Sequence, residues 1–497
     1  MSINFIPNDP GAGATAPPIR IQPKRPDRPS AKAGFTFSGV SPEGTFAPGT
    51  SQFLFWQCRE AALAAVQAWE ASASAHKKWQ GNRKKLPLLQ DSGEDLNAFY
   101  DRLSFSFFHQ AVAGTTFFSG ASTDVVAHET GHGLLDSVRP DFFDVNFLEV
   151  GAFHEAFGDC IALLTALEDQ ETRQKLLAVT ATLRKRSFVE TTAENLSEGI
   201  RRLIPTHNAA EPRHAFNTLK FQLPQTLPDD GGPGVLINEV HSFGMIFTGC
   251  FWDLIANLFG AAASQTEATL LSAARTAGRI LIEGTKSAIV TPRFLQSVGR
   301  AMVLTDETRN GGANRDRIRD AFQRHDILLG ANAMLAPSMA LAGTAPKKST
   351  SLGSATRKDL LKRLGIVKGA KLSLSKANLF GKPVVSVVHK QEVPLGTLDN
   401  RLKGVVAEAH APIMVGASGA KAAVIGTPPH PADAESEVQA FVKTLLKHGR
   451  IDFGKQKRGA VAGNRERVHT THEIKSVAGK KVLRRVRFLC ARCSWSV

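Results

Sequence analysis

Apolar residues recur at helical spacing between residues 52 and 80, which predicts an amphipathic helix there. Its apolar positions are Trp56, Leu63, Val66 and Trp69. Between residues 97 and 110 the period shortens to two, since Leu103, Phe105 and Phe107 alternate with serines. This alternation is typical of a strand with one covered face, so we expect a β-strand after the first helix.

The rest of the chain divides into a long helical part and a smaller mixed unit. Patterns from residue 123 to 322 are mostly helical, broken by turn-forming clusters at 229–234 and 310–314. Residues 331–355 are rich in Ala, Gly, Ser and Thr, which predicts an interdomain linker. Beyond the linker, apolar runs predict strands at 383–389, 402–407, 421–426 and 482–489, with a helix from Pro431.

Charge is distributed unevenly along the chain. The sequence holds 61 Lys and Arg against 45 Asp and Glu, a net charge of +16. Residues 331–497 hold 29 of the basic and 10 of the acidic residues, a net of +19, which leaves −3 for the first 330. The basic end predicts a weak electrostatic partner for residues 346–497, either nucleic acid or an anionic surface. Plain solvated charge is the alternative, and sparse aromatic residues disfavour base stacking.

The composition, 42% hydrophobic and 21% charged, excludes a collagen-like, coiled-coil or wholly disordered chain. Residues 1–34 hold seven prolines and no apolar core of signal-peptide length, which predicts a Pro-rich disordered arm. No transmembrane segment is expected, because polar residues and glycines interrupt the most apolar stretch at 327–345. We therefore expect a cytoplasmic protein, with non-classical export as the alternative.

The five cysteines show no disulfide framework, which fits a reducing compartment. Two of them, Cys490 and Cys493, form a Cys-x-x-Cys near the end of the chain, after His469 and His472. These four side chains could hold a structural zinc ion, and unliganded thiols are the alternative.

The clearest chemical signal is the His-Glu-Thr-Gly-His run from His128 to His132. Residues four apart lie on one face of a helix, so both imidazoles can reach one metal ion, with Glu129 placed to act on water. A pair of surface histidines is the alternative. Leu135 and Val138 stand where a metzincin requires Gly and His, so that class is excluded.

A second helical run, from Gly151 to Leu167, carries Glu155 and Asp159 four residues apart. Apolar neighbours make a buried face the better interpretation, and buried carboxylates require a partner. One of the two can bind a metal ion while the other orients a ligand histidine.

These segments resemble the thermolysin-like zinc metallopeptidases (gluzincins, with His-Glu-x-x-His and a downstream Glu-x-x-x-Asp). The resemblance covers about residues 50 to 328. Its motifs are Asn97–Tyr100, Asp124–Glu129 with His132 and Asp136, Gly151–Asp159, and Glu239–Gly244. The resemblance implies a zinc-dependent endopeptidase that uses metal-activated water, with a preference for a bulky apolar residue after the scissile bond.

The resemblance also implies a role for each matching residue. His128, His132 and Glu155 bind zinc, Glu129 is the general base, and His241 stabilises the oxyanion. Supporting roles fall to Asp159, which orients His128, and to Asp136. Substrate contacts fall to Asn97, Ala98 and Val125.

Some family features are missing. Tyr100 is the single tyrosine, so the family's oxyanion tyrosine between the two metal helices is absent, and Asn146 is the substitute that the loop offers. Leu236 stands where the family places an acidic partner for the catalytic histidine, although Asn238 or Glu239 could replace it.

The family's calcium sites and pro-region also fit poorly. Asp124 matches one calcium ligand, but Ala166 stands at an expected acidic position, so calcium is doubtful. We therefore expect neither the signal nor the long pro-region of secreted relatives.

Together these observations predict an α+β chain: a thermolysin-like peptidase with a β-rich N-terminal lobe and a helical C-terminal lobe, followed by a small basic α+β domain. The expected divisions are the arm (1–34), the N-terminal lobe with the active-site helix (35–150), the helical lobe (151–330), the linker (331–355) and the basic domain (356–497). The alternative function is a catalytically weak or inactive zinc-stabilised binding module, tethered by its basic domain to nucleic acid or an anionic surface.

Overall fold

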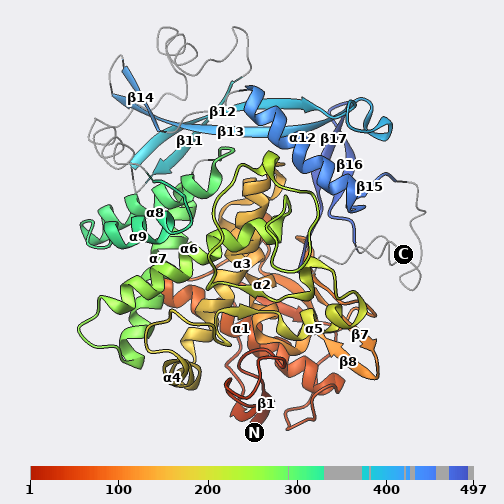
Figure 1. Cartoon of the computed structure of the whole chain (residues 1–497), viewed down its shortest axis with the longest axis vertical. Coiled ribbons are helices and arrows are strands. Elements are labelled where there is room, and N and C mark those ends of the chain that lie inside the picture. The colour runs from red at the N-terminus through yellow and green to blue at the C-terminus, as the bar shows by residue number, and fades with distance from the viewer. Residues whose placement is uncertain are drawn as a thin grey trace.

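The computed structural model describes residues 2–288, 290–329, 372–379, 382–418, 421–425, 431–454 and 469–490. Helices and several small sheets make up the described chain, so the mixed α and β class is confirmed. Figure 1 shows the N-terminal hairpin at one end of the molecule, the helices in the middle, and a large sheet with one helix at the other end. The linker predicted for 331–355 lies outside the described residues.

Four helices surround the centre of the molecule. They are α1 (Ser51–Ser72), α2 (Thr123–Val138), α3 (Leu148–Glu168) and α6 (Val240–Gly260). The predicted first helix corresponds to α1, which begins where the Thr50 side chain accepts a hydrogen bond from the Phe53 amide. Two glycines let α2 and α3 approach closely, because a Cβ atom on Gly131 would lie 2.9 Å from the Cα atom of Gly158.

Further helices pack around this centre. They are α4 (Gln170–Val179), α5 (Glu194–Leu203), α7 (Glu267–Ser287), α8 (Phe294–Asn310) and α9 (Arg315–Gln323). By length and composition alone, α3 and α6 could cross a membrane, but both are largely buried inside the protein. Their apolar sequences are therefore explained by their position in the core.

A five-stranded sheet lies beside the central helices, with strand order β18-β5-β6-β4-β3. Its strands are β3 (Gly34–Phe37), β4 (Lys85–Leu89), β5 (Ala98–Tyr100), β6 (Phe105–Phe107) and β18 (Phe488–Leu489). The predicted period-two strand is only partly right, because Leu103 lies exposed in the turn between β5 and β6. Arg102 in this turn has a φ of 69°, which ends the extended conformation.

The prediction of a disordered N-terminal arm is wrong. Strands β1 (Ser2–Phe5) and β2 (Arg20–Pro23) pair antiparallel, and Ile3 and Phe5 are buried. The side chain of Gln57 on α1 holds this hairpin through both backbone groups of Ile6, at 2.9 and 3.0 Å. Prolines do not prevent this structure, because an edge strand tolerates them where no amide donor is needed.

Two short hairpins complete the N-terminal part of the chain (residues 2–329), β7 (His109–Val112) with β8 (Thr115–Phe118) and β9 (Thr191–Thr192) with β10 (Arg213–His214).

The C-terminal part forms a seven-stranded sheet of order β11-β12-β13-β17-β16-β15, with β14 paired to β13. Its elements are β11 (Leu372–Leu379), β12 (Lys382–Pro394), β13 (Val405–Ser418), β14 (Lys421–Ile425), α12 (Pro431–Lys447), β15 (Ile451–Asp452), β16 (His472–Val477) and β17 (Lys480–Arg485). Arg293 at the start of α8 joins this unit to the N-terminal part, because it forms ion pairs with Glu149 and with Glu437 of α12.

Candidate active site

The His-Glu-x-x-His residues lie on α2 inside the protein. The helix begins at the Ser122 cap, whose hydroxyl accepts a hydrogen bond from the Val125 amide. Ligand atoms of His128, Glu129 and His132 all lie within 4.8 Å of one another, and the three side chains have no exposed surface. A pair of surface histidines is therefore not what the structure contains.

Glu155 reaches this group from α3. Its Oε2 atom is 3.2 Å from His128 Nε2 and 3.5 Å from His132 Nε2. Its other oxygen, His132 Nε2 and both Glu129 oxygens are buried without a hydrogen-bond partner among the described residues. Two imidazoles, a ligand carboxylate and unsatisfied buried atoms at one point form a donor set that fits zinc.

Burial sets the proton affinity of the general-base candidate. It raises the pKa of Glu129 to about 8, although the charge of His128 opposes the shift. Glu155 behaves differently: burial alone would raise its pKa, but His241 and His132 hold it well below its usual range.

Each metal-ligand candidate on α2 has a partner on its far side. Asp159 Oδ1 lies 2.8 Å from His128 Nδ1 and also receives a hydrogen bond of 2.9 Å from Arg213. His154 Nδ1 lies 2.8 Å from His132 Nδ1, which fixes the orientation of that ring. The sequence interpretation missed His154 and Arg213. His154 directly precedes Glu155 in the sequence, and this position was a usable signal. No sequence signal pointed to Arg213.

Asp136 lies farther along α2 and binds other residues. It accepts a hydrogen bond of 2.9 Å from the Tyr100 hydroxyl and pairs with Arg102 at 2.7 Å. The described contacts therefore join α2 to β5 at this residue.

His241 lies in the first turn of α6 and faces the same centre. The Glu239 carboxylate caps the helix by accepting hydrogen bonds from the His241 and Ser242 amides, and its Oε1 is 2.8 Å from His241 Nδ1. Burial alone would lower the pKa of His241, but the carboxylates of Glu155 and Glu239 raise it to about 9. Of the candidates to replace the acidic partner missing at Leu236, Glu239 is the residue in contact.

Asn146 does not face the metal-ligand candidates in this way. Its amide donates a hydrogen bond of 3.4 Å to the Leu483 carbonyl in β17. The structure thus gives this side chain a partner in the C-terminal unit.

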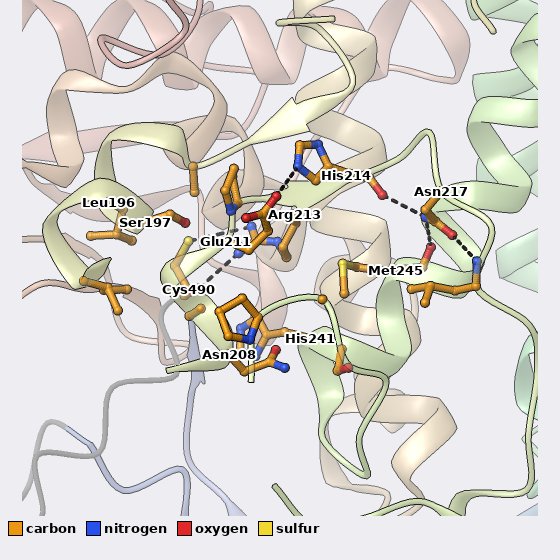
Figure 2. Close-up of a pocket in the computed structure, with 18 of the residues that line it drawn as sticks. Leu196, Ser197, Asn208, Glu211, Arg213, His214, Asn217, His241, Met245 and Cys490 are labelled. Carbon is orange, nitrogen blue, oxygen red and sulfur yellow. Dashed lines mark hydrogen bonds and ion pairs between the residues drawn. The ribbon is translucent and has the colours of Figure 1, made fainter. Parts of the chain in front are cut away.

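The end of the described chain lies between the edge of β5 and the first turn of α6, a space that we call the cleft. Strand β18 pairs antiparallel with β5, and the Cys490 amide donates a hydrogen bond of 2.8 Å to the Ala98 carbonyl. The Leu489 carbonyl oxygen lies 2.6 Å from His241 Nε2. Figure 2 shows Cys490 beside Arg213, whose guanidinium donates a hydrogen bond of 3.2 Å to the Cys490 carbonyl.

This position separates Cys490 from the two histidines predicted to share a zinc ion with it. His472 Nδ1 is bonded to the Thr471 hydroxyl, and His469 lies 3.7 Å from Asp95. Among the described residues, neither belongs to a metal-like group with Cys490, and Cys493 lies outside those residues.

A pocket of about 460 Å³ opens beside Cys490. Its wall includes Leu196, Ile200, Met245, Arg213 and His241, and Figure 2 shows most of these side chains around one space. Of the predicted substrate-binding residues, Ala98 lies on the edge of β5, where it contacts the C-terminal segment. Asn97 is buried beside it, and its side-chain oxygen accepts from the Ala98 amide at 2.9 Å. Val125 is fully buried in α2.

A separate acidic cluster holds Asp124, the residue that the resemblance connects with calcium. Carboxylate oxygens of Asp9, Asp124 and Glu194 lie within 4.8 Å of one another. Burial and the charge of Asp124 raise the pKa of Asp9 to about 8, and burial raises the pKa of Glu194 to about 11. The N-terminal segment thus contributes a carboxylate that binds its proton tightly.

This cluster predicts a pH-dependent stability. The pKa of Asp9 is higher in the folded protein than its ordinary value of 3.8, so its contribution is complete at low pH and is lost as the pH rises toward 8. We expect the stability advantage of the wild type over Asp9→Asn to shrink by up to about 1.4 kcal/mol per pH unit across this range. Denaturant titrations between pH 5 and 8 measure it, and parallel curves for the two proteins would contradict it.

Comparison with known proteins agrees with the arrangement of the site. Residues 105–333 match the family of fungalysin metallopeptidases (M36), and this span contains α2, α3 and His241. No curated protein matches the chain in sequence. The family match and the buried His-Glu-x-x-His group identify residues 105–333 as a fungalysin-type, thermolysin-like domain, and the chain as a zinc metalloendopeptidase.

Proposed function

We propose that His128, His132 and Glu155 hold the catalytic zinc, and that the cleft along β5 cleaves extended peptides before a bulky apolar residue. The observation that carries this proposal is the convergence on Glu155, whose Oε2 lies within 3.5 Å of the Nε2 atoms of His128, His132 and His241. When bound, zinc polarises the scissile carbonyl and acidifies water at the site.

The protein's own side chains then handle the protons and the substrate. Glu129 accepts a proton from the attacking water and delivers it to the leaving amine. His241 donates a hydrogen bond to the oxygen of the scissile carbonyl, and Glu239 holds its ring in that orientation. The family's oxyanion tyrosine is missing, but His241 is a second donor and Glu239 holds it in place. The oxyanion site therefore keeps one of its two donors.

Specificity is assigned to the pocket beside Cys490. Its apolar wall, which includes Leu196, Ile200 and Met245, and its volume of about 460 Å³ suit a large apolar side chain. Arg213, on the same wall, suits the carbonyl of the residue that enters the pocket.

The test is a cleavage profile on a proteome-derived peptide library. It uses the full-length Phe488→Ala protein, which lacks the ring that lies beside His132 in the cleft. We expect one zinc ion per chain and cuts enriched before Leu, Ile, Phe or Met, both abolished by a chelator and restored by zinc. Zinc and peptide binding without any cleavage would favour the alternative of a tethered binding module instead.

A further inference from the structure

We propose that the C-terminal segment is the first substrate of its own active site, cut between Leu489 and Cys490, and that it closes the cleft to other substrates until then. This inference rests on the proposed function. Residues Phe488, Leu489 and Cys490 are each at most 2% exposed, so the segment fills the cleft instead of lying across its surface.

The backbone of the segment binds as an extended substrate would. Strand β18 adds to the edge of β5, with Leu489 opposite Phe99 and Phe488 opposite Tyr100. The Cys490 amide continues the ladder through its hydrogen bond to the Ala98 carbonyl at 2.8 Å. Addition of a strand to an open sheet edge is a general way to bind an extended peptide.

Three consecutive backbone groups define which bond is presented. The Leu489 carbonyl oxygen is 2.6 Å from His241 Nε2, and this nitrogen is 3.2 Å from Glu155 Oε2. The next amide, that of Cys490, is held by Ala98, and the next carbonyl is held by Arg213 at 3.2 Å. The carbonyl at the oxyanion donor is therefore that of Leu489, which makes Leu489–Cys490 the bond to be cut.

Side chains on both sides of this bond occupy defined positions. The Phe488 ring stacks on His132 and His154, with centroid distances of 4.8 and 4.0 Å and interplanar angles of 19° and 20°. On the other side, Cys490 lies in the wall of the 460 Å³ pocket, with its Sγ 3.9 Å from Arg213. The residue after the bond therefore lies at the pocket assigned to that position.

The C-terminal unit delivers the segment to this place. Strand β17 docks on the peptidase part through the hydrogen bond from Asn146 to Leu483, and Arg485 fits against Gly151, where a Cβ atom would lie 2.9 Å from the guanidinium. Only two residues separate Arg485 from the start of β18, and the Arg485 guanidinium lies 4.3 Å from the centre of the Phe488 ring. Because the connection between β17 and β18 is so short, a docked C-terminal unit places β18 in the cleft of its own chain.

The reaction is a simple hydrolysis. Water adds its hydroxyl to the Leu489 carbonyl carbon, the bond to the Cys490 nitrogen breaks, and Glu129 transfers the remaining proton to that nitrogen. The products are a chain that ends in the Leu489 carboxylate and a free peptide of residues 490–497. The cut removes the Ala98 and Arg213 contacts from the chain that remains, which opens the pocket side of the cleft.

The experiment follows intact mass after zinc is added to full-length, metal-free protein. We expect loss of residues 490–497 at a first-order rate that does not change with protein concentration. Cys490→Pro lacks the amide that Ala98 binds and should be cut at least ~10-fold more slowly, whereas Cys490→Ala keeps that amide, loses only the side-chain contact with the pocket wall, and should be cut within a few-fold of the wild-type rate. A cut at another bond, equal rates for the two variants, or a rate that scales with protein concentration would overturn the proposal.

A second measurement, the alkylation rate of Cys490, does not depend on peptidase activity. In metal-free protein, Cys490 should resist alkylation, and Phe488→Ala should raise its alkylation rate at least ~10-fold, with buried Cys250 as the internal reference. Alkylation of wild-type Cys490 at the rate of the unfolded chain would overturn the proposal.

The two measurements also separate this inference from the proposed function. If Phe488→Ala cuts library peptides while the zinc-loaded wild type keeps residues 490–497, self-cleavage is wrong and the peptidase function stands. If neither protein cuts anything, both fail.

Discussion

Glu129→Gln is expected to lower kcat/KM on peptides by ~10²–10⁴-fold while the protein keeps one zinc ion per chain. Both carboxylate oxygens of Glu129 are buried without a hydrogen-bond partner among the described residues, so the exchange for an amide breaks no hydrogen bond there. His128, His132 and Glu155 are unchanged. The loss therefore reflects the missing proton acceptor.

Zinc content and kinetics measured on the same preparation decide this prediction. A matched control is Glu198→Gln on the surface of α5, where the carboxylate pairs only with arginines of its own helix among the described residues, and which should leave kcat/KM unchanged. Full activity of Glu129→Gln would remove this residue from the mechanism. Loss of zinc together with activity would assign it to the metal site instead.

Gly131→Ala is expected to destabilise the protein by about 1–3 kcal/mol and to weaken zinc binding. Its Cβ atom would lie 2.9 Å from the Cα atom of Gly158 and 3.2 Å from the Cβ atom of Ile161, so α2 and α3 must move apart. Alanine normally favours a helix interior over glycine by about 0.5–1 kcal/mol, but backbone contact at this distance outweighs that gain. His132 lies on α2 and Glu155 on α3, so this movement also increases the distance between the proposed zinc ligands.

Gly260→Ala is the matched control, since a Cβ atom on Gly260 at the end of α6 would have nothing within 4 Å. It should be neutral or stabilise by up to about 1 kcal/mol. Urea midpoints and competitive zinc titration measure both variants. Equal behaviour of the two alanine variants would show that the Gly131–Gly158 contact does not matter.

The sequence could predict what depends on local spacing. The candidate ligands at i and i+4 on α2, and the Glu155–Asp159 pair on α3, follow from helix periodicity, and the resemblance added His241. Glu239 could be named only as one of two substitutes, because the contact depends on how the first turn of α6 is capped.

Non-local contacts could not be predicted in this way. Arg213 comes from a two-residue strand, and β18 pairs with β5 although Leu489 and Phe99 are 390 residues apart, so neither leaves a periodic pattern. The prediction for residues 1–34 was wrong for a related reason. The N-terminal hairpin is held by Gln57 of α1, and its own composition does not show this contact. The two residues of β18 are also too few to read as a strand that fills a cleft.

The strand that covers the cleft is synthesised long after the other elements of the cleft. Helices α2 and α3, strand β5 and His241 leave the ribosome well before Phe488, and the peptidase part ends about 160 residues earlier. At 5–20 residues per second, this gap lasts roughly 10–30 s. Every nascent chain therefore passes through an interval in which no β18 covers the cleft. If zinc binds during this interval, the first bond cut is in another protein; if it binds later, the first bond cut is Leu489–Cys490 of the same chain.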